Sequence, residues 1–431
     1  MKICMFTNTY LPHVGGVARS VSFFAEDLRK MGHEVLVIAP TFPGLSPGLE
    51  EGGRVVRVPA LQNFNGSDFS VRLPLPFTIN KQLERFQPDI IHSHHPYLMG
   101  DSALRMAMRH DLPLVFTHHT LYEHYTHYVP LNSTKMKQFV LELSTKYANM
   151  CSMVVAPSDS IYRILQERGV TTPIEVIPTG VDLDFFAGGR GDQFKDKHGM
   201  GKASLVIGYV GRLAPEKNLE YLSRAVALYL QSDPRAVFLV VGEGPSRDNI
   251  QEILQEKGVS DRLILAGQQS GQGLADAYGA MDLFVFSSTT ETQGMVLAEA
   301  MAASKPVIAL DSSGVREVVV DGENGRLLDV ESSEQDFAQA MKEFALDLEK
   351  AERWRQNALK TARIFSREHC ARRMADLYER VRESFVKEDV WSSHELASWE
   401  SVLRGIKAQW QLLSHKTRAA VRALRQDEDR M

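Results

Sequence analysis

The chain has 431 residues, of which 44% are hydrophobic and 24% are charged, and its formal net charge is −5. This composition is typical of a globular protein long enough for two domains of roughly 180 to 200 residues, and it provides no excess positive charge to hold nucleic acid. The three cysteines, Cys4, Cys151 and Cys370, are far apart and odd in number, which favours a reducing compartment. No signal-peptide core or bilayer-spanning apolar run is evident, so we expect a cytoplasmic protein.

Short apolar runs alternate with helix-length segments through the first half of the chain, and the same rhythm then restarts. Such runs, rich in Val, Ile and Leu, predict strands of parallel sheets buried on both faces. The first series comprises Lys2 to Thr7, Glu34 to Ala39, Arg54 to Pro59, Asp89 to His92, Leu114 to Thr117, Met153 to Ala156 and Glu175 to Ile177. The second series comprises Leu205 to Val210, Ala236 to Val241, Leu263 to Ala266, Leu283 to Phe286, Pro306 to Leu310 and Arg326 to Leu328.

The two series are separated by Gly180 to Lys202, a glycine-rich stretch of mixed charge that we interpret as a linker. We therefore predict a first domain over residues 1–185, a second over residues 186–385 and a helical extension over residues 386–431. Ligands of open α/β sheets bind at the carboxyl ends of the strands, so two facing sheets would share one cleft. That geometry suits a reaction between two substrates.

The segment SSTTETQGMVLAEAMAASKP carries most of the expected chemistry. Gly294 permits a tight turn and strong helix formers follow it, so the free amides at the helix start would form an anion site. Glu291 precedes this helix and could reach sugar hydroxyls, whereas Glu299, about two turns further on, could accept both hydrogen bonds of a ribose diol. The alternative is a helix capped by Thr290 or Thr292, with Glu299 in solvent.

This segment resembles the E-x7-E signature of retaining glycosyltransferases of family 4. Related phrases occur in the family's order along nearly the whole chain: YLPHVGG from Tyr10, IPTGVD from Ile177, YVGRLAPEKN from Tyr209, VGEGP from Val241 and DGENG from Asp321. The resemblance implies an α/β protein of GT-B fold, with two Rossmann-like domains facing across a cleft and C-terminal helices. The first domain would bind the acceptor and the second a nucleotide sugar.

The resemblance also assigns roles to residues near the strand ends. Arg212 and Lys217 would bind the donor diphosphate and neutralise the leaving group, although without the resemblance they would be interpreted as solvated charges. Gly15 and Gly16 would let the backbone lie beside the donor phosphates, but a simple left-handed turn fits them equally well. The remaining donor-binding residues are expected at the helix start and along the helix: Gly294, Met295, Val296 and Glu299.

His119 would lie beside the transferred sugar, because Thr117, His119 and Thr120 match the family's T-x-H-T motif. The neighbouring histidines lack the spacing of a zinc site, so most are expected to be ordinary loop or pocket residues. They are His92, His94, His95, His118, His124 and His127. Asp182 and Asp184 mimic a metal-binding DxD motif, but their place in the linker disfavours that role. We expect neither a metal nor a cofactor.

The expected mechanism is transfer with retention of configuration, as the family implies. His119, Glu291, Arg212 and Lys217 are the predicted catalytic residues. No nucleophile stands out for the opposite face of the sugar, so we expect same-face transfer in which the leaving phosphate helps to deprotonate the acceptor.

The acceptor is suggested by THHTLYEHYTHY, which is closer in wording to bacterial diacylglycerol glucosyltransferases than to soluble sugar synthases of the family. Tyr122, Tyr125 and Tyr128 could line an apolar groove or pack on the next helix. Between Ser401 and Arg425 there are six cations and no carboxylate, which fits either a membrane-surface helix or a terminal helix packed on the first domain.

The leading hypothesis is therefore transfer of glucose from UDP-glucose to a membrane lipid such as diacylglycerol, at the inner face of the membrane. A soluble sugar or sugar-phosphate acceptor and a non-catalytic nucleotide-sugar-binding regulator are the alternatives. The sequence leaves the base, the sugar, the acceptor and the oligomeric state open.

Overall fold

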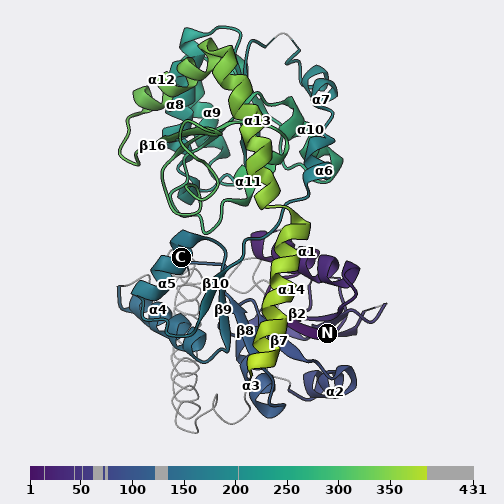
Figure 1. Ribbon diagram of the computed structural model, residues 1–431. Coiled ribbons are helices and arrows are strands. Elements are labelled where there is room, and N and C mark those ends of the chain that lie inside the picture. Colours follow the sequence, from purple (N-terminus) through teal and green to yellow (C-terminus); the bar gives the residue numbers. More distant parts are fainter. Residues whose placement is uncertain are drawn as a thin grey trace, which may run out of the picture.

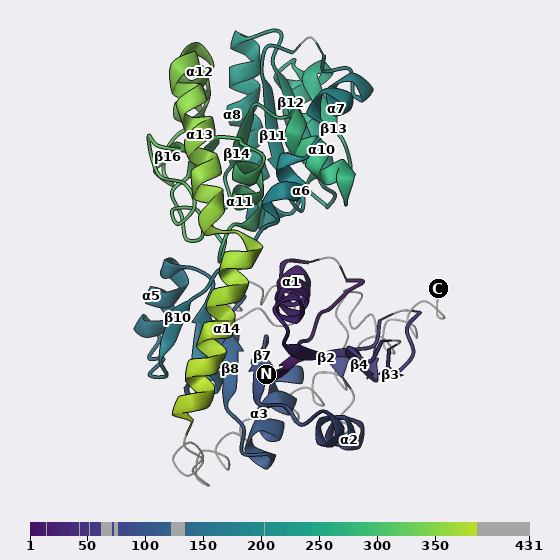
Figure 2. The same ribbon diagram turned by 45° about the vertical axis from the view of Figure 1, so that its right-hand side comes forward.

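The computed structural model describes residues 1–13, 15–42, 44–50, 52–61, 71–72, 76–121, 134–201 and 203–385. Over these residues the chain forms two α/β domains, one above the other in Figures 1 and 2, each built on a mainly parallel sheet. The expected pair of Rossmann-like domains is confirmed.

The first domain contains an eight-stranded sheet in the order β10-β9-β8-β7-β1-β2-β4-β3, parallel except for the β3–β4 pair at its edge. Its strands are β1 (Lys2–Phe6), β2 (Glu34–Pro40), β3 (Gly48–Leu49), β4 (Val55–Val58), β7 (Ile90–Ser93), β8 (Leu114–Thr117), β9 (Met153–Ala156) and β10 (Ile174–Val176). A separate antiparallel pair joins β5 (Ala60–Leu61) to β6 (Val71–Arg72). The two-residue strands are too short to leave an apolar run, which is why the sequence does not reveal them.

Helices cover both faces of the first sheet, and alternate strand residues point to opposite faces. Ile3 and Met5 lie in one core with α1 (Gly16–Lys30) and α14 (Arg367–Ser384). Cys4 and Phe6 lie in the other core, with four helices. These are α2 (Pro76–Phe86), α3 (Met99–Arg109), α4 (Thr134–Asn149) and α5 (Asp159–Glu167).

The second domain contains a six-stranded parallel sheet in the order β13-β12-β11-β14-β15-β16. Its strands are β11 (Val206–Val210), β12 (Val237–Val241), β13 (Leu263–Leu265), β14 (Leu283–Phe286), β15 (Val307–Leu310) and β16 (Gly325–Leu328). Its helices after β11 are η3 (Pro215–Lys217), α8 (Leu219–Ser232), α9 (Arg247–Glu256), η4 (Ser260–Arg262), α10 (Gln272–Ala280), α11 (Met295–Ala302), α12 (Glu334–Leu346) and α13 (Leu348–Ile364). In both sheets, the strands expected from sequence agree with these bounds to within one residue at each end.

The stretch Gly180 to Lys202, which we interpreted as a linker, is instead largely helical. It contains α6 (Leu183–Ala187) and α7 (Gly191–Lys197), which pack on α10. A Cβ atom on Gly189 would lie 2.2 Å from the carbonyl oxygen of Ala275. Gly189, like Gly180 and Gly191, therefore permits close approach of backbones rather than flexibility.

The chain returns to the first domain through α14, yellow in Figure 1, which leaves the second domain and runs along the first. Cys370, Met374 and Tyr378 of this helix are fully buried in the core that contains Ile3, Met5 and α1. Our sequence boundary at residue 385 groups α14 with the second domain, whereas its apolar side packs on the first sheet. Sequence position alone does not reveal this crossing.

Three parts of the sequence interpretation lie outside the described residues: the tyrosines Tyr122, Tyr125 and Tyr128, the histidines His124 and His127, and the extension over residues 386–431. Among the helices that are described, none combines the length and the apolar character that a bilayer span requires.

Candidate active site

The candidate donor residues gather where the strand order of the second sheet reverses. From β11 the chain adds β12 and β13 on one side and β14 to β16 on the other, so the ends of β11 and β14 are neighbours. Such a switch point is where open α/β sheets bind ligands. Arg212 and Lys217 follow β11, and Glu291 follows β14. The topology thus brings together residues that are distant in sequence.

Lys217 and Glu291 form one unit at this switch point. The Lys217 Nζ atom lies 2.5 Å from Oε1 of Glu291, and 17% and 16% of the two side chains are exposed. The Ser287 hydroxyl at the end of β14 donates to the carbonyl oxygens of Lys217 and Asn218, at 3.0 Å each. Because the ion pair is shielded from water and anchored through the backbone, its charges interact more strongly than a surface pair would.

Arg212 is placed differently. Its guanidinium pairs with the carboxylate of Glu216 one turn along the loop, and half of its side chain is exposed. Both predicted cations therefore sit at the carboxyl end of β11, and each is paired with a carboxylate.

The start of α11 has the form expected of an anion site. Gly294 is buried in the left-handed conformation (φ 66°), and a Cβ atom there would lie 2.7 Å from the carbonyl oxygen of Gly314, so a larger residue is excluded. The first-turn amides of Met295 and Val296 have no carbonyl one turn earlier to bond. No side chain caps this helix, so the alternative of a threonine cap is wrong.

Glu299 is buried, with 1% of its side chain exposed, so the solvated alternative is also wrong. Its Oε1 atom accepts from Arg19 Nη2 at 2.6 Å, and its Oε2 atom accepts from the Tyr278 hydroxyl at 2.8 Å. The nearby Glu299 carboxylate raises the pKa of Arg19. A carboxylate has about four acceptor positions, so two remain after these contacts. That is the number a ribose diol needs.

Arg19 comes from α1 of the first domain, and our sequence reasoning did not select it. A signal was nevertheless present. A cation in the first turn of a helix opposes the helix dipole, so an arginine there is electrostatically unfavourable unless an anion pairs with it. The partner, Glu299, lies 280 positions further along the chain.

The loop that carries Glu291 is hydrogen-bonded to three segments of the first domain. The Ser158 hydroxyl donates to the carbonyl oxygen of Thr292 at 2.7 Å. The side-chain amide of Gln293 accepts from the backbone N–H of Thr179 at 2.8 Å and donates to its carbonyl oxygen at 2.7 Å. The Thr292 hydroxyl donates to the carbonyl oxygen of His119 at 3.0 Å. His119 is thereby tied to the residue next to Glu291, although the two belong to different domains.

Five histidines lie in or directly after β7 and β8, and we call them the histidine cluster: His92, His94, His95, His118 and His119. All are buried except His119, which is half-buried. Burial lowers the pKa of four of them to about 3 and that of His94 well below its ordinary value. The rings are therefore neutral at physiological pH. Within the described part of the chain, no group of three or more His, Cys, Asp or Glu residues could hold a metal ion.

Neither of the two glycines after β1 makes a left-handed turn, and Gly16 leaves open space beside it. Gly15 is extended (φ −176°) and α1 begins at Gly16, and neither has a positive φ, so the left-handed turn is wrong. A Cβ atom on Gly16 would meet nothing within 4 Å. The space beside the start of α1 allows a ligand to approach the backbone.

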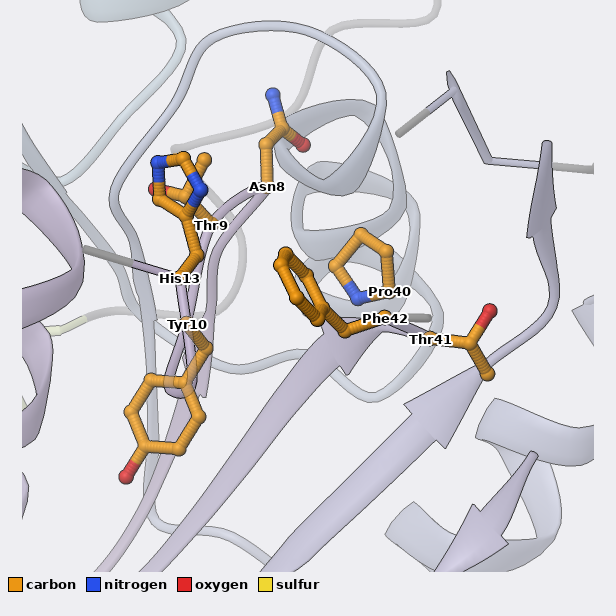
Figure 3. Close-up of a pocket in the computed structure, with 7 residues that line it drawn as sticks. All are labelled: Asn8, Thr9, Tyr10, His13, Pro40, Thr41 and Phe42. Carbon is orange, nitrogen blue, oxygen red and sulfur yellow. The ribbon is translucent and has the colours of Figure 1, made fainter. Parts of the chain in front are cut away.

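A small concavity lies beside this loop at the ends of β1 and β2. Figure 3 shows the side chains that line it, which are Asn8, Thr9, Tyr10, His13, Pro40, Thr41 and Phe42. The rings of His13 and Phe42 meet edge to face, with centroids 6.3 Å apart. The lining thus combines aromatic faces with hydroxyl and amide groups.

The remaining acidic pair has a structural role. Asp182 caps α6, because its Oδ1 atom accepts from the amide of Phe185 at 3.1 Å. Asp184 lies in the first turn of the same short helix, where a negative charge is favourable.

Two Rossmann-like domains are thus joined at the loop that carries Glu291 and leads into α11, and Lys217 of η3 pairs with this glutamate. This combination of fold and residues agrees with the sugar transfer expected from the sequence.

Comparison with known proteins gives the family. Residues 14–185 match the family described as Glycosyltransferase Family 4, and residues 191–361 match Glycosyl transferases group 1. The chain is 30% identical over 337 residues to alpha-monoglucosyldiacylglycerol synthase of Acholeplasma laidlawii, covering 75% of this chain and 84% of that one. It is also 30% identical over 338 residues to a GDP-mannose-dependent alpha-mannosyltransferase of Mycobacterium tuberculosis, covering 77% and 84%. The chain belongs to glycosyltransferase family 4, and it is a glycosyltransferase.

Solved structures confirm the GT-B fold. Anabaena HepE in complex with UDP and glucose superposes with a TM-score of 0.70 at 21% identity, covering 88% of this chain and all of that one. Sucrose-phosphate synthase of Thermosynechococcus elongatus gives a TM-score of 0.73 at 21% identity, covering 89% and 99%.

Proposed function

We propose that this protein is a retaining hexosyltransferase that moves glucose from UDP-glucose to a membrane lipid such as diacylglycerol. The observation that carries the proposal is one continuous arrangement of three groups. Lys217 contacts Glu291, and the next residue, Thr292, donates to the carbonyl oxygen of His119. A cation for the leaving group and a carboxylate for the sugar therefore lie next to the backbone of His119, where the two domains meet.

Donor cleavage would use the second domain. As the bond between the anomeric carbon and the diphosphate breaks, negative charge develops on the leaving oxygen. Arg212, Lys217 and the first-turn amides of α11 would stabilise that charge. When Lys217 turns to the phosphate, the Glu291 carboxylate becomes available to accept hydrogen bonds from the sugar. The two remaining acceptor positions of Glu299 would hold the ribose.

Transfer would occur on the face from which the diphosphate leaves. The acceptor oxygen forms the new bond to the anomeric carbon, and its proton passes to the departing phosphate, so no enzymic nucleophile is required. Neutral His119 would hydrogen-bond a sugar hydroxyl without adding charge. Since side chains and amides neutralise the diphosphate, we also propose that the reaction needs no metal and persists in EDTA.

A lipid acceptor is supported by the relatives and by the first domain. Proteins from Acholeplasma laidlawii and Streptococcus pneumoniae, 30% and 29% identical to this chain, carry the name alpha-monoglucosyldiacylglycerol synthase. The concavity beside His13 and Phe42 offers aromatic surface for a glycerol group and polar atoms for a hydroxyl. The buried free thiols of Cys4, Cys151 and Cys370 fit a cytoplasmic protein, which would act at the inner membrane face.

A second donor is favoured by a specific observation, because three mannosyltransferases named as GDP-mannose-dependent are 30–31% identical to this chain. A soluble acceptor is favoured by a relative named D-inositol 3-phosphate glycosyltransferase, which is 29% identical over 384 residues.

One product assay decides among these functions. The full chain is incubated with UDP-glucose or GDP-mannose, together with diacylglycerol vesicles or inositol phosphate, and the product's anomeric configuration is read by NMR. An α-glucosyl lipid from UDP-glucose supports the proposal. A β-linked product contradicts retention, a mannosyl or soluble product selects the corresponding alternative, and nucleotide binding without transfer selects the regulator.

A further inference from the structure

His94, which is buried, and His119, which is half-buried, form an imidazole pair. The Nδ1 atom of His94 lies 3.0 Å from Nε2 of His119, and the two rings are stacked at 24° with centroids 5.3 Å apart. His94 is fully buried, and its Nε2 atom has no hydrogen-bond partner among the described residues. His94 follows β7 and His119 follows β8, so adjacent strands hold the two rings together.

The pair is supported on its inner side. The ring of His92 lies 4.1 Å from that of His94, centroid to centroid. His92 is itself fixed by the hydroxyls of Tyr378, 2.6 Å from Nδ1, and Thr117, 2.7 Å from Nε2. The backbone amide of His94 donates to the carbonyl oxygen of Phe6 at 2.9 Å. His94 therefore cannot turn its ring without disturbing the core of the first domain.

Two neutral imidazoles that share a hydrogen bond have one donor and one acceptor, which leaves two arrangements. If His119 donated from Nε2, then His94 would carry its proton on Nε2, and a buried N–H group would have no acceptor. If His94 donates from Nδ1, only an acceptor nitrogen is left without a partner. Buried N–H groups without an acceptor are rare in folded proteins, so the second arrangement is favoured.

We propose that His94 is a positioning residue, which holds His119 in the tautomer protonated at Nδ1. With Nε2 of His119 committed to His94, Nδ1 is the ring nitrogen left for a ligand, and it is a hydrogen-bond donor. His119 would then donate to an oxygen of the transferred sugar and could not accept from a sugar hydroxyl at that nitrogen. The part played in sugar transfer rests on the proposed function, whereas the tautomer does not.

Three substitutions of His94 separate this role from packing. His94→Asn keeps an N–H group where Nδ1–H stands, His94→Leu removes every donor, and His94→Asp replaces the donor with an acceptor. The full chain is labelled with ¹⁵N-histidine, His119 is assigned by comparison with His119→Gln, and its tautomer is read from the ring nitrogens. Transfer is measured with UDP-glucose, UDP affinity by calorimetry and folding by thermal melting.

We expect His119 of the unaltered protein to carry its proton on Nδ1. His94→Asn should keep this tautomer and most of kcat, whereas His94→Leu should lower kcat about 10- to 100-fold, as loss of a supporting partner of a functional histidine does, with UDP affinity unchanged. His94→Asp should move the proton to Nε2. The proposal is overturned if His119 of the unaltered protein is protonated at Nε2, or if the Asn variant is as impaired as the Leu variant while both melt normally. A protein without transferase activity would refute the proposed function, and the ring-nitrogen signals would still decide the tautomer.

Discussion

Replacing Glu299 with Gln should weaken nucleotide binding through the ribose. Both carboxylate oxygens are engaged, by Arg19 at 2.6 Å and by Tyr278 at 2.8 Å. An amide NH2 group cannot accept from a guanidinium, so the glutamine oxygen must turn to Arg19 and its nitrogen to the Tyr278 hydroxyl. The ribose would then meet one acceptor oxygen instead of two.

The size of the effect follows from these contacts. A hydrogen bond to a charged group contributes about 1.5–3 kcal/mol. Glu299→Gln removes one such bond to the ribose and weakens the other, so UDP affinity should fall about 10- to 150-fold. The variant should remain folded, because Gln preserves the shape of the side chain and both protein contacts.

The assay is calorimetric titration of UDP and 2′-deoxy-UDP into the unaltered protein and the variant. The 2′-deoxy ligand should bind more weakly to the unaltered protein, and this penalty should shrink in Glu299→Gln. Glu252→Gln, an exposed change on α9, is the matched control and should alter nothing. If both proteins showed the same penalty, Glu299 would not hold the ribose. GDP and its 2′-deoxy form provide the same comparison if the base is guanine.

Three further outcomes can be measured. Lys217→Ala and Glu291→Ala should each lower the rate of sugar transfer about 100-fold. The two effects should not add in the double variant, because the side chains form one ion pair. Rates within about twofold of normal would contradict the site assignment. Arg19→Gln should lower the free energy of unfolding by about 1–3 kcal/mol, because it breaks the charged hydrogen bond to Glu299. The melting temperature should fall by about 2–4 °C per kcal/mol. Arg316→Gln, which breaks an exposed ion pair, is the control and should show no such fall. Acid should destabilise the fold through the histidine cluster, because folded-state pKa values of about 3 lie below the ordinary 6.5, and the unfolded chain binds more protons between these values. The contribution of these histidines to the free energy of unfolding should therefore be fully present above pH 6.5. Below pH 6.5 it should decrease by up to about 1.4 kcal/mol per pH unit for each histidine. Melting temperatures that stay unchanged from pH 7.5 to 5.5 would refute this.

The sequence predicts the strands well, and it predicts ligand binding at their carboxyl ends. Runs such as Leu283 to Phe286 are short, apolar and bounded by polar residues, so their local pattern is sufficient. Neighbouring strands then bring Lys217 to Glu291 through topology alone. The class of protein follows from the same segment.

What the sequence does not predict depends on contacts between distant segments. The burial of Glu299 requires Arg19 and Tyr278, and the side of the molecule that α14 covers requires knowledge of both cores. The glycines at positions 189 and 191 are ambiguous for the same reason, because a flexible linker and a close backbone contact use the same residue.

The path of α14 has a consequence for how the protein can be made. Val181 and Ser366 pair where the chain passes between the domains, and the helix that follows completes the apolar core over α1. Synthesis runs from the N-terminus, so the core that the first sheet shares with α1 stays incomplete until α14 has been made. A fragment that ends at residue 185 would lack α14 altogether. We therefore expect the two domains to complete their folding together.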